Sequence, residues 1–184
     1  MKKYFILSWK EILILTIFFT LAFLLRLFLF HLEPIANSDG IGYTEIGINL
    51  ISGRGYVNSL GEPSYRDWPI YPIFIGLANI FLRDHTFAGP FVSMVFGSLS
   101  IFIIFLFAKN IYNVKIGYLA AFIAVWYPYL SNNASKDYNS ATYIFFLLLA
   151  AYCGWIVYRE NSRSSYFICG LFTGLAYLTR FEII

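Results

Sequence analysis

The stretch ILILTIFFTLAFLLRLFLF, residues 12–30, decides the fold class of this chain. A helix needs about 20 predominantly apolar residues to cross the hydrocarbon core of a bilayer, and this stretch carries a single charge, Arg26. Lys2 and Lys3 precede it, as basic residues precede the core of a signal peptide. However, the apolar stretch is longer than such a core, and no small-x-small cleavage site follows it. We therefore expect an uncleaved transmembrane helix.

The composition of the 184 residues supports the same conclusion. Hydrophobic residues make up 59% of the chain, charged residues 12%, and the mean hydropathy is +0.67. Soluble domains have about a quarter of their residues charged, so this chain has too few charges to cover a soluble surface. Four more apolar stretches follow the first, at 87–108, 116–130, 141–158 and 166–178. We predict an all-α membrane protein with about five transmembrane helices.

The distribution of charge indicates how these helices are oriented. A sixth apolar stretch, Pro69–Leu82, is short and contains two prolines, and we place it at the membrane surface. The segments on one side of the membrane then carry seven basic and two acidic residues, and those on the other side five basic and eight acidic. Because basic loops stay in the cytoplasm, we expect a cytoplasmic N-terminus in the plasma (inner) membrane and a long outer segment, 31–86.

The outer segment contains signals for two further helices. Asn37-Ser38-Asp39-Gly40 is typical of a helix start, and isoleucines then recur at helical spacing at positions 41, 48 and 51. Gly53 and Gly55 would end this helix, and the apolar run from Pro69 would form the second. We expect two amphipathic helices that lie on the outer membrane face.

The fifth apolar stretch contains the motif GLFTG, residues 170–174. Small residues four positions apart let two membrane helices approach closely, so helix packing explains this motif without any chemistry. We expect these glycines at a contact between helices.

The predicted topology brings acidic and basic residues to the outer side together. The acidic residues are Asp39, Asp137 and Glu182, and the basic ones are Arg66, Lys136, Arg180 and, one turn inside the first helix, Arg26. A carboxylate can take a proton from an acceptor hydroxyl while Arg and Lys bind the phosphate of a lipid-linked donor. This arrangement suits group transfer at a membrane surface.

Simpler roles are available for the same residues. Asp39 stands where an N-cap residue would stand, and Arg26 could extend its charged end to the outer headgroups. Lys136 and Asp137 could form a solvated pair in a loop, and Tyr71 could anchor a helix at the interface. The residues alone leave these alternatives open.

Taken in order, the motifs resemble the N-terminal part of the GT-C membrane glycosyltransferases. These enzymes include the protein O-mannosyltransferases and the lipid A aminoarabinose transferases. The similar segments are SDGIGY at 38–43, NLISGRGY at 49–56, YRDWPIYP at 65–72, Asp137 in the second outer loop, and LTRFE at 178–182. The resemblance covers nearly the whole chain.

The resemblance implies an activity and assigns roles to residues. Members take a sugar from a polyprenyl-phosphate carrier and pass it to an acceptor with inversion, and Asp39 would be the catalytic carboxylate. The substrate-binding residues would be Arg26, Arg66, Tyr71, Lys136, Asp137, Arg180 and Glu182. Some members need a divalent metal and others do not, so the cofactor stays open. The acceptor could be a lipid, a glycan or a protein, and we expect no nucleic-acid partner.

Members of the GT-C group are longer than this chain. We therefore expect residues 1–184 to be the N-terminal transmembrane part of such an enzyme and to be inactive alone. The alternatives are a multispan transporter or flippase of lipid-linked substrates, and a non-catalytic membrane assembly subunit. Transporters place ionisable residues near the middle of the bilayer, whereas here the middle of each predicted span is almost free of charge.

Overall fold

The computed structural model describes residues 2–32, 38–65 and 67–180. Apart from an isolated bridge between Val57 and Pro63, these residues form helices and loops without a strand. The described helices are η1 (Lys2–Phe5), α1 (Trp9–Leu32), α2 (Ser38–Ile51), α3 (Ile70–Leu82), α4 (His85–Ile111), α5 (Val114–Trp126), α6 (Pro128–Asn133), α7 (Ser140–Glu160) and α8 (Arg163–Tyr177). The predicted all-α fold is confirmed.

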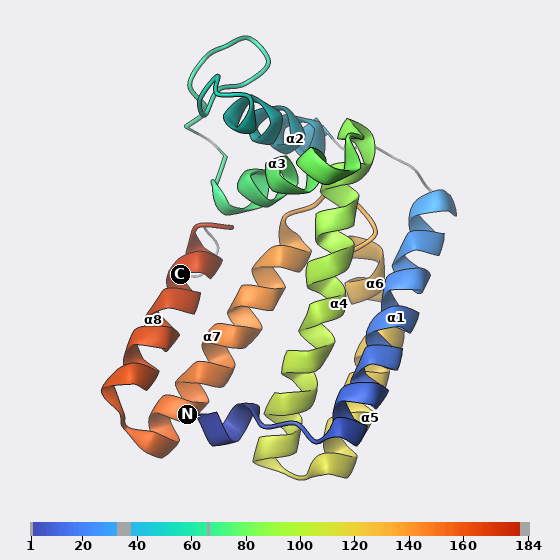
Figure 1. The fold of residues 1–184 in the computed structure, drawn as a ribbon, viewed down its shortest axis with the longest axis vertical. Coiled ribbons are helices and arrows are strands. Elements are labelled where there is room, and N and C mark those ends of the chain that lie inside the picture. Colours follow the sequence, from blue (N-terminus) through green and yellow to red (C-terminus); the bar gives the residue numbers. More distant parts are fainter. Residues whose placement is uncertain (1, 33–37, 66, 181–184) are drawn as a thin grey trace.

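One group of helices runs along the long axis of the molecule, and another lies across one end of it (Figure 1). The long bundle contains α1, α4, α5, α7 and α8, whereas α2 and α3 cover the end at which α1 and α8 finish. Helix α4 is central and packs against α1, α3, α5 and α7. The ring of Phe96 on α4 contacts Phe74 of α3 at 4.7 Å and Phe145 and Phe146 of α7 at 5.2 and 5.7 Å, measured between ring centroids.

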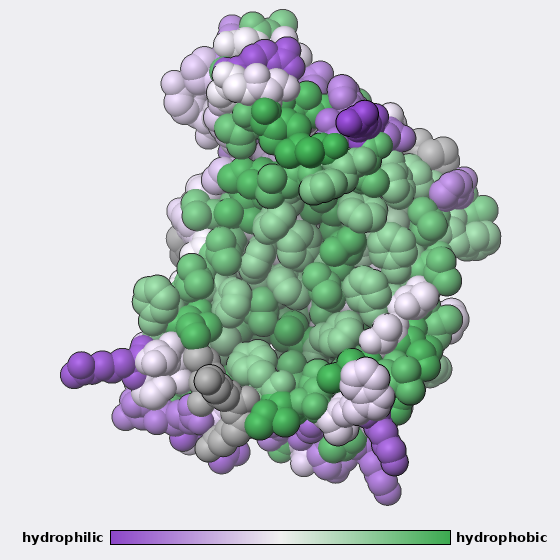
Figure 2. Space-filling model, viewed as in Figure 1, coloured by the Kyte–Doolittle hydropathy of each residue, from purple (hydrophilic) through white to green (hydrophobic). Residues whose placement is uncertain are grey.

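The surface of the bundle suits a membrane. Figure 2 shows an apolar band around the middle of the visible face, with hydrophilic side chains gathered at the two ends. Three helices, α1, α4 and α7, are long and apolar enough to cross a bilayer. Large apolar side chains of α1, such as Leu13, Leu24 and Phe28, are more than half exposed, as lipid-facing side chains are. The chain is an integral membrane protein.

The third and fifth predicted spans correspond to shorter helices. Helix α5 has 13 residues and α8 has 15, below the roughly 20 that cross a bilayer alone. The predicted span 116–130 is divided at Tyr127, whose backbone is extended with ψ of 115°. Pro128 causes this break, because the residue before a proline is pushed out of the helical conformation. Helix α6 starts anew at Pro128 and leads toward the end covered by α2 and α3.

A pair of glycines lets α2 and α3 touch through their backbones. A Cβ at Gly47 would lie 2.5 Å from the carbonyl oxygen of Pro72, and one at Gly76 would lie 2.6 Å from the carbonyl oxygen of Gly47. Gly170 and Gly174 behave differently, since a Cβ at either would meet no described atom within 4 Å. Within the described chain, the close helix contact expected at 170–174 is therefore absent, and Gly47 and Gly76 form such a contact instead.

Polar caps fix where the helices begin at the end opposite α2 and α3. Asn113 caps α5 by accepting from the Ile116 N–H, and Ser162 caps α8 by accepting from the Ser165 N–H. Glu11, in the first turn of α1, is also 2.7 Å from the Lys109 Nζ at the end of α4. The starts of α1, α5 and α8 and the end of α4, which the sequence assigned to one side of the membrane, thus lie together at one end of the bundle.

Candidate active site

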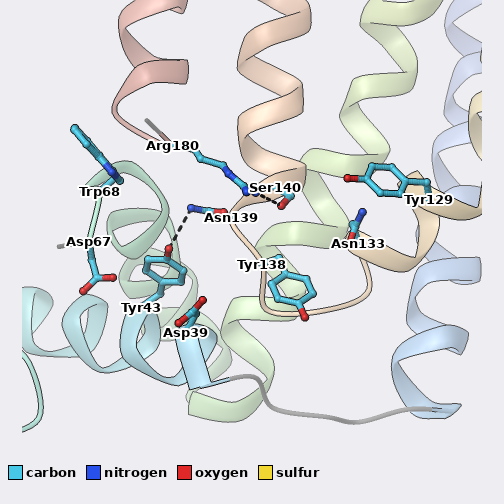
Figure 3. A pocket seen from close by; sticks show the side chains of 10 residues that line it. All are labelled: Asp39, Tyr43, Asp67, Trp68, Tyr129, Asn133, Tyr138, Asn139, Ser140 and Arg180. Atoms are coloured by element: carbon cyan, nitrogen blue, oxygen red, sulfur yellow. Dashed lines mark hydrogen bonds between the residues drawn. The ribbon is translucent and has the colours of Figure 1, made fainter. Parts of the chain in front are cut away.

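A polar cavity of about 560 Å³ opens at the end where α2 and α3 cover the bundle. Side chains from segments far apart in the sequence line it (Figure 3): Asp39, Tyr43, Asp67, Trp68, Tyr129, Asn133, Tyr138, Asn139, Ser140 and Arg180. They come from α2, from the loop before α3, from α6 and the α6–α7 loop, from the first residue of α7, and from the segment after α8. The helices at this end of the bundle therefore converge on one hollow.

Asp39 reaches the cavity from the first turn of α2. It is the second helical residue, and its side chain is exposed. Tyr43 follows one turn later and lines the same cavity, as residues four apart on a helix do. The next residue, Gly40, is buried against the side chain of Asp137, and a Cβ at Gly40 would overlap the Asp137 carboxylate. Asp39 and Asp137, two of the three acidic residues predicted from the sequence, are therefore close together in the structure.

Hydrogen bonds tie α2 to the start of α7 and to the end of α8. The Asn139 Nδ2 donates to the Tyr43 hydroxyl at 3.2 Å and to the Thr179 carbonyl oxygen at 3.1 Å. The Arg180 Nη1 donates to the Ser140 hydroxyl at 2.9 Å (Figure 3). These bonds position Arg180 on the wall of the cavity.

The loop before α3 supplies a second carboxylate. The Asp67 Oδ2 accepts from the Ser64 hydroxyl at 2.7 Å, and the Tyr56 hydroxyl donates to the Asp67 carbonyl oxygen at 2.9 Å. Burial, and then the nearby Asp67 carboxylate, raise the pKa of Tyr56 above its usual range. Tyr56 therefore stays neutral and continues to hold the loop. Trp68 packs edge-on against Tyr177 at 5.2 Å and closes this side of the cavity.

The predicted site residues divide into those that line the cavity and those that do not. Asp39 and Arg180 line it. Asp137 is 6% exposed, and Lys136 is half-buried; neither is among the lining residues. Arg66 and Glu182 lie outside the described residues.

Two other predicted substrate contacts are buried and do not line the cavity. Tyr71 is fully buried, with its hydroxyl 3.1 Å from the Gly89 carbonyl oxygen and 2.8 Å from the Ser93 hydroxyl. These bonds fasten α3 to α4, so Tyr71 acts here in packing. Arg26 is 1% exposed, and thus it does not extend to the headgroups. Neither side chain lines the cavity, and we do not assign either one a direct substrate contact.

Several lining residues were not identified from the sequence. These are Tyr43, Asp67, Trp68, Tyr129, Asn133, Tyr138, Asn139 and Ser140. Spacing could have indicated Tyr43, which follows Asp39 by one helical turn. The asparagines and tyrosines of α6 and the following loop give no such signal, because the folding of the loop alone brings them to the cavity.

The cavity combines groups that can move a proton with groups that can bind an anion. Asp39 and Asp67 offer carboxylates, and Arg180 offers a guanidinium, which pairs well with phosphate. The part of the chain that the structure describes contains no group of three or more His, Cys, Asp or Glu side chains able to bind a metal ion. The tyrosines, Trp68 and the amides add stacking surfaces and hydrogen-bonding groups.

Comparison with known proteins identifies the family. The sequence model of the dolichyl-phosphate-mannose-protein mannosyltransferases matches residues 63–184. The chain belongs to this family of GT-C membrane glycosyltransferases. The match includes Trp68, Asn139 and Arg180 of the cavity wall, and Asp39 precedes it. The chain has no match among curated proteins or among solved structures.

Proposed function

We propose that this protein transfers a sugar from a polyprenyl-phosphate carrier to an acceptor hydroxyl at the outer face of the membrane. One observation carries the proposal: Asp39 and Arg180 line a single polar cavity at the end of an apolar helix bundle. Membership of the glycosyltransferase family supports the reaction class. The position of the cavity fits a lipid donor, whose chain would stay in the bilayer while its sugar reaches water.

The chemistry needs one base and one stabilised leaving group. The Asp39 carboxylate would accept the proton of the acceptor hydroxyl as that oxygen forms a bond to the anomeric carbon. The bond between the anomeric carbon and the phosphate oxygen breaks at the same time, and the electron pair leaves with the polyprenyl phosphate. A single displacement of this kind inverts the anomeric carbon. Arg180 would bind the phosphate, and Arg66 and Lys136 stay predicted substrate contacts.

The exposure of Asp39 favours this role over a purely structural one. Asp39 is the second residue of α2, so the N-cap position of the helix lies before it. Its exposed carboxylate can meet an acceptor that arrives from water, whereas Asp137 is buried against Gly40. We therefore assign Asp39 as the base and Asp137 as the support for the backbone beside it.

The substitution Asp39→Asn in the full-length protein tests the assignment. The amide keeps the shape of the side chain but cannot accept the proton, so we expect sugar transfer to fall by about 10²–10⁴-fold, the usual contribution of a general base. Transfer is measured with a radiolabelled polyprenyl-phosphate sugar in membranes. The matched control is Glu45→Gln, which also replaces a carboxylate by its amide. Glu45 lies on the same helix but does not line the cavity.

Transfer and expression of the two variants together show whether Asp39 acts in catalysis or in folding. We expect Asp39→Asn to insert and accumulate like the unchanged protein and to show this fall in transfer, while Glu45→Gln retains transfer. Normal transfer by Asp39→Asn would refute the assigned role. Transport of the lipid-linked sugar without transfer, in the unchanged protein, would favour the flippase alternative.

A further inference from the structure

Arg26 is a buried cation for which the described chain provides no carboxylate. Its Nη1 donates to the Ala22 carbonyl oxygen of its own helix at 2.9 Å, and its Nη2 donates to the Gly97 carbonyl oxygen at 3.5 Å. The Nε has no hydrogen-bond partner, and no ion pair joins Arg26 to a described residue. A guanidinium keeps its charge at any ordinary pH, so Arg26 brings a full positive charge into the bundle.

Burying this charge destabilises the folded protein, so the presence of Arg26 suggests that its charge has a function. Taking an ion out of water costs several kcal/mol in real proteins, and carbonyl oxygens offset only part of this. A Leu or Met would pack at this place in α1 without that cost. Charged residues within membrane helices are accordingly most often functional.

Glycine 97 shows where the guanidinium lies relative to the polar cavity. A Cβ at Gly97 would be 3.2 Å from the Arg26 Nε, 2.6 Å from the Ala134 Cβ and 3.7 Å from the Ala141 Cβ. Ala134 follows Asn133 in the chain, Ala141 follows Ser140, and both Asn133 and Ser140 line the cavity. The guanidinium therefore lies close to small residues that adjoin two lining positions of the cavity.

The charges on the wall itself do not favour an anion. Among the described lining residues, the charged ones are Asp39, Asp67 and Arg180, two acids and one base. A polyprenyl phosphate is negatively charged and would meet a net negative lining. Because a positive charge acts over a longer distance in a protein interior than in water, Arg26 can offset one of these carboxylates without touching the ligand.

We propose that Arg26 determines specificity: it is a buried counter-charge through which the polar cavity selects the phosphorylated lipid over the neutral polyprenol. This inference rests on the proposed donor class. It assigns Arg26 an electrostatic effect through the wall, in place of a direct contact. Gly97 belongs to this arrangement, since a Cβ there would be 2.6 Å from the Ala134 Cβ and 3.2 Å from the Arg26 Nε, and one of them would have to move.

The test compares two lipids that differ only in charge. The full-length protein in nanodiscs is titrated with polyprenyl phosphate and with the polyprenol of the same length. Arg26→Met removes the charge and keeps much of the length, and Arg26→Lys keeps the charge. We expect Arg26→Met to lose about tenfold of the preference for the phosphate, the order expected for unit charges across a protein interior, and Arg26→Lys to keep most of it. Polyprenol binding should be equal in all three proteins.

Each other result overturns the inference. An unchanged preference in Arg26→Met shows that the charge is not used, and an equal loss of both lipids shows a structural role. If Arg26→Met does not fold, the salt dependence of the unchanged protein decides, because salt screens exposed charges far more than buried ones. A preference that disappears in high salt would come from exposed cations instead. No preference in the unchanged protein would refute the proposed donor class as well.

Discussion

At the scale of single residues, the contact between Gly40 and Asp137 holds the start of α2, which carries Asp39, against the loop before α7. Asp137 is buried, and its carboxylate fills the space beside the Gly40 backbone, next to Asp39. This contact explains why position 40 has no side chain although it lies within a helix, where glycine is unfavourable relative to alanine by roughly 1 kcal/mol.

The substitution Gly40→Ala therefore should damage the site. Its methyl group would overlap the Asp137 carboxylate, and relieving the overlap would move either α2 or the loop that carries Asp137. We expect a destabilisation of about 1–3 kcal/mol, as for other overpacked positions, together with loss of transfer. Thermal unfolding in detergent and the transfer assay measure the two effects. Gly42→Ala is the control, since nothing lies within 4 Å of a Cβ there. Equal behaviour of the two variants would contradict the interpretation.

Sequence reasoning identified Asp39 and Arg180 because charged residues are rare in this chain and their side of the membrane could be inferred. It did not identify Asn139, which hydrogen-bonds both Tyr43 and the Thr179 carbonyl oxygen. It also gave Tyr71 the role of an interfacial anchor or a substrate contact, although α3 turns that face inward against α4. Helical period indicates which residues share a face, but the partner that covers the face depends on tertiary packing.

At the scale of helices, α2 and α3 act as a unit because their backbones touch. The sequence predicted both helices from Asn37-Ser38-Asp39-Gly40 and from the run after Pro69, and the structure has them at 38–51 and 70–82. It could not predict their contact, since Gly47 stands in no motif. The same limit applies to the motif at 170–174, since a Cβ at Gly170 or Gly174 would meet nothing within 4 Å in the described chain.

The contact between α2 and α3 can be tested with Gly76→Ala. The added methyl would press on the Gly47 carbonyl oxygen, which belongs to the backbone and cannot rotate away. We expect α2 to shift, with a loss of roughly 1–3 kcal/mol in stability and reduced transfer. Proteolysis of the outer segment and the transfer assay report the shift. Gly174→Ala, another glycine-to-alanine change in a helix, should leave both unchanged; similar damage by both variants would argue against a specific contact.

At the scale of the whole molecule, the charges define two different ends. The turns that connect α4 to α5 and α7 to α8 lie at the end of the N-terminus, whereas α2, α3 and the polar cavity lie at the other (Figure 1). The sequence placed these same segments on opposite sides from charge alone. Packing and the positive-inside bias thus agree on which segments belong together, and the bias alone predicts which end faces the cytoplasm.

Reporter fusions to the full-length protein measure that direction. Because basic loops remain in the cytoplasm, a reporter near Asn113, between Lys109 and Lys115, should be active only inside, and one near Asn58 only outside. Replacing Lys109, Lys115, Arg159 and Arg163 by Gln should weaken this orientation, while the same change at Arg54 should not. If the unchanged protein showed the reverse pattern, the polar cavity would face the cytoplasm. The donor would then have to present its sugar on the inner leaflet, and the proposed reaction would belong to the other side of the membrane.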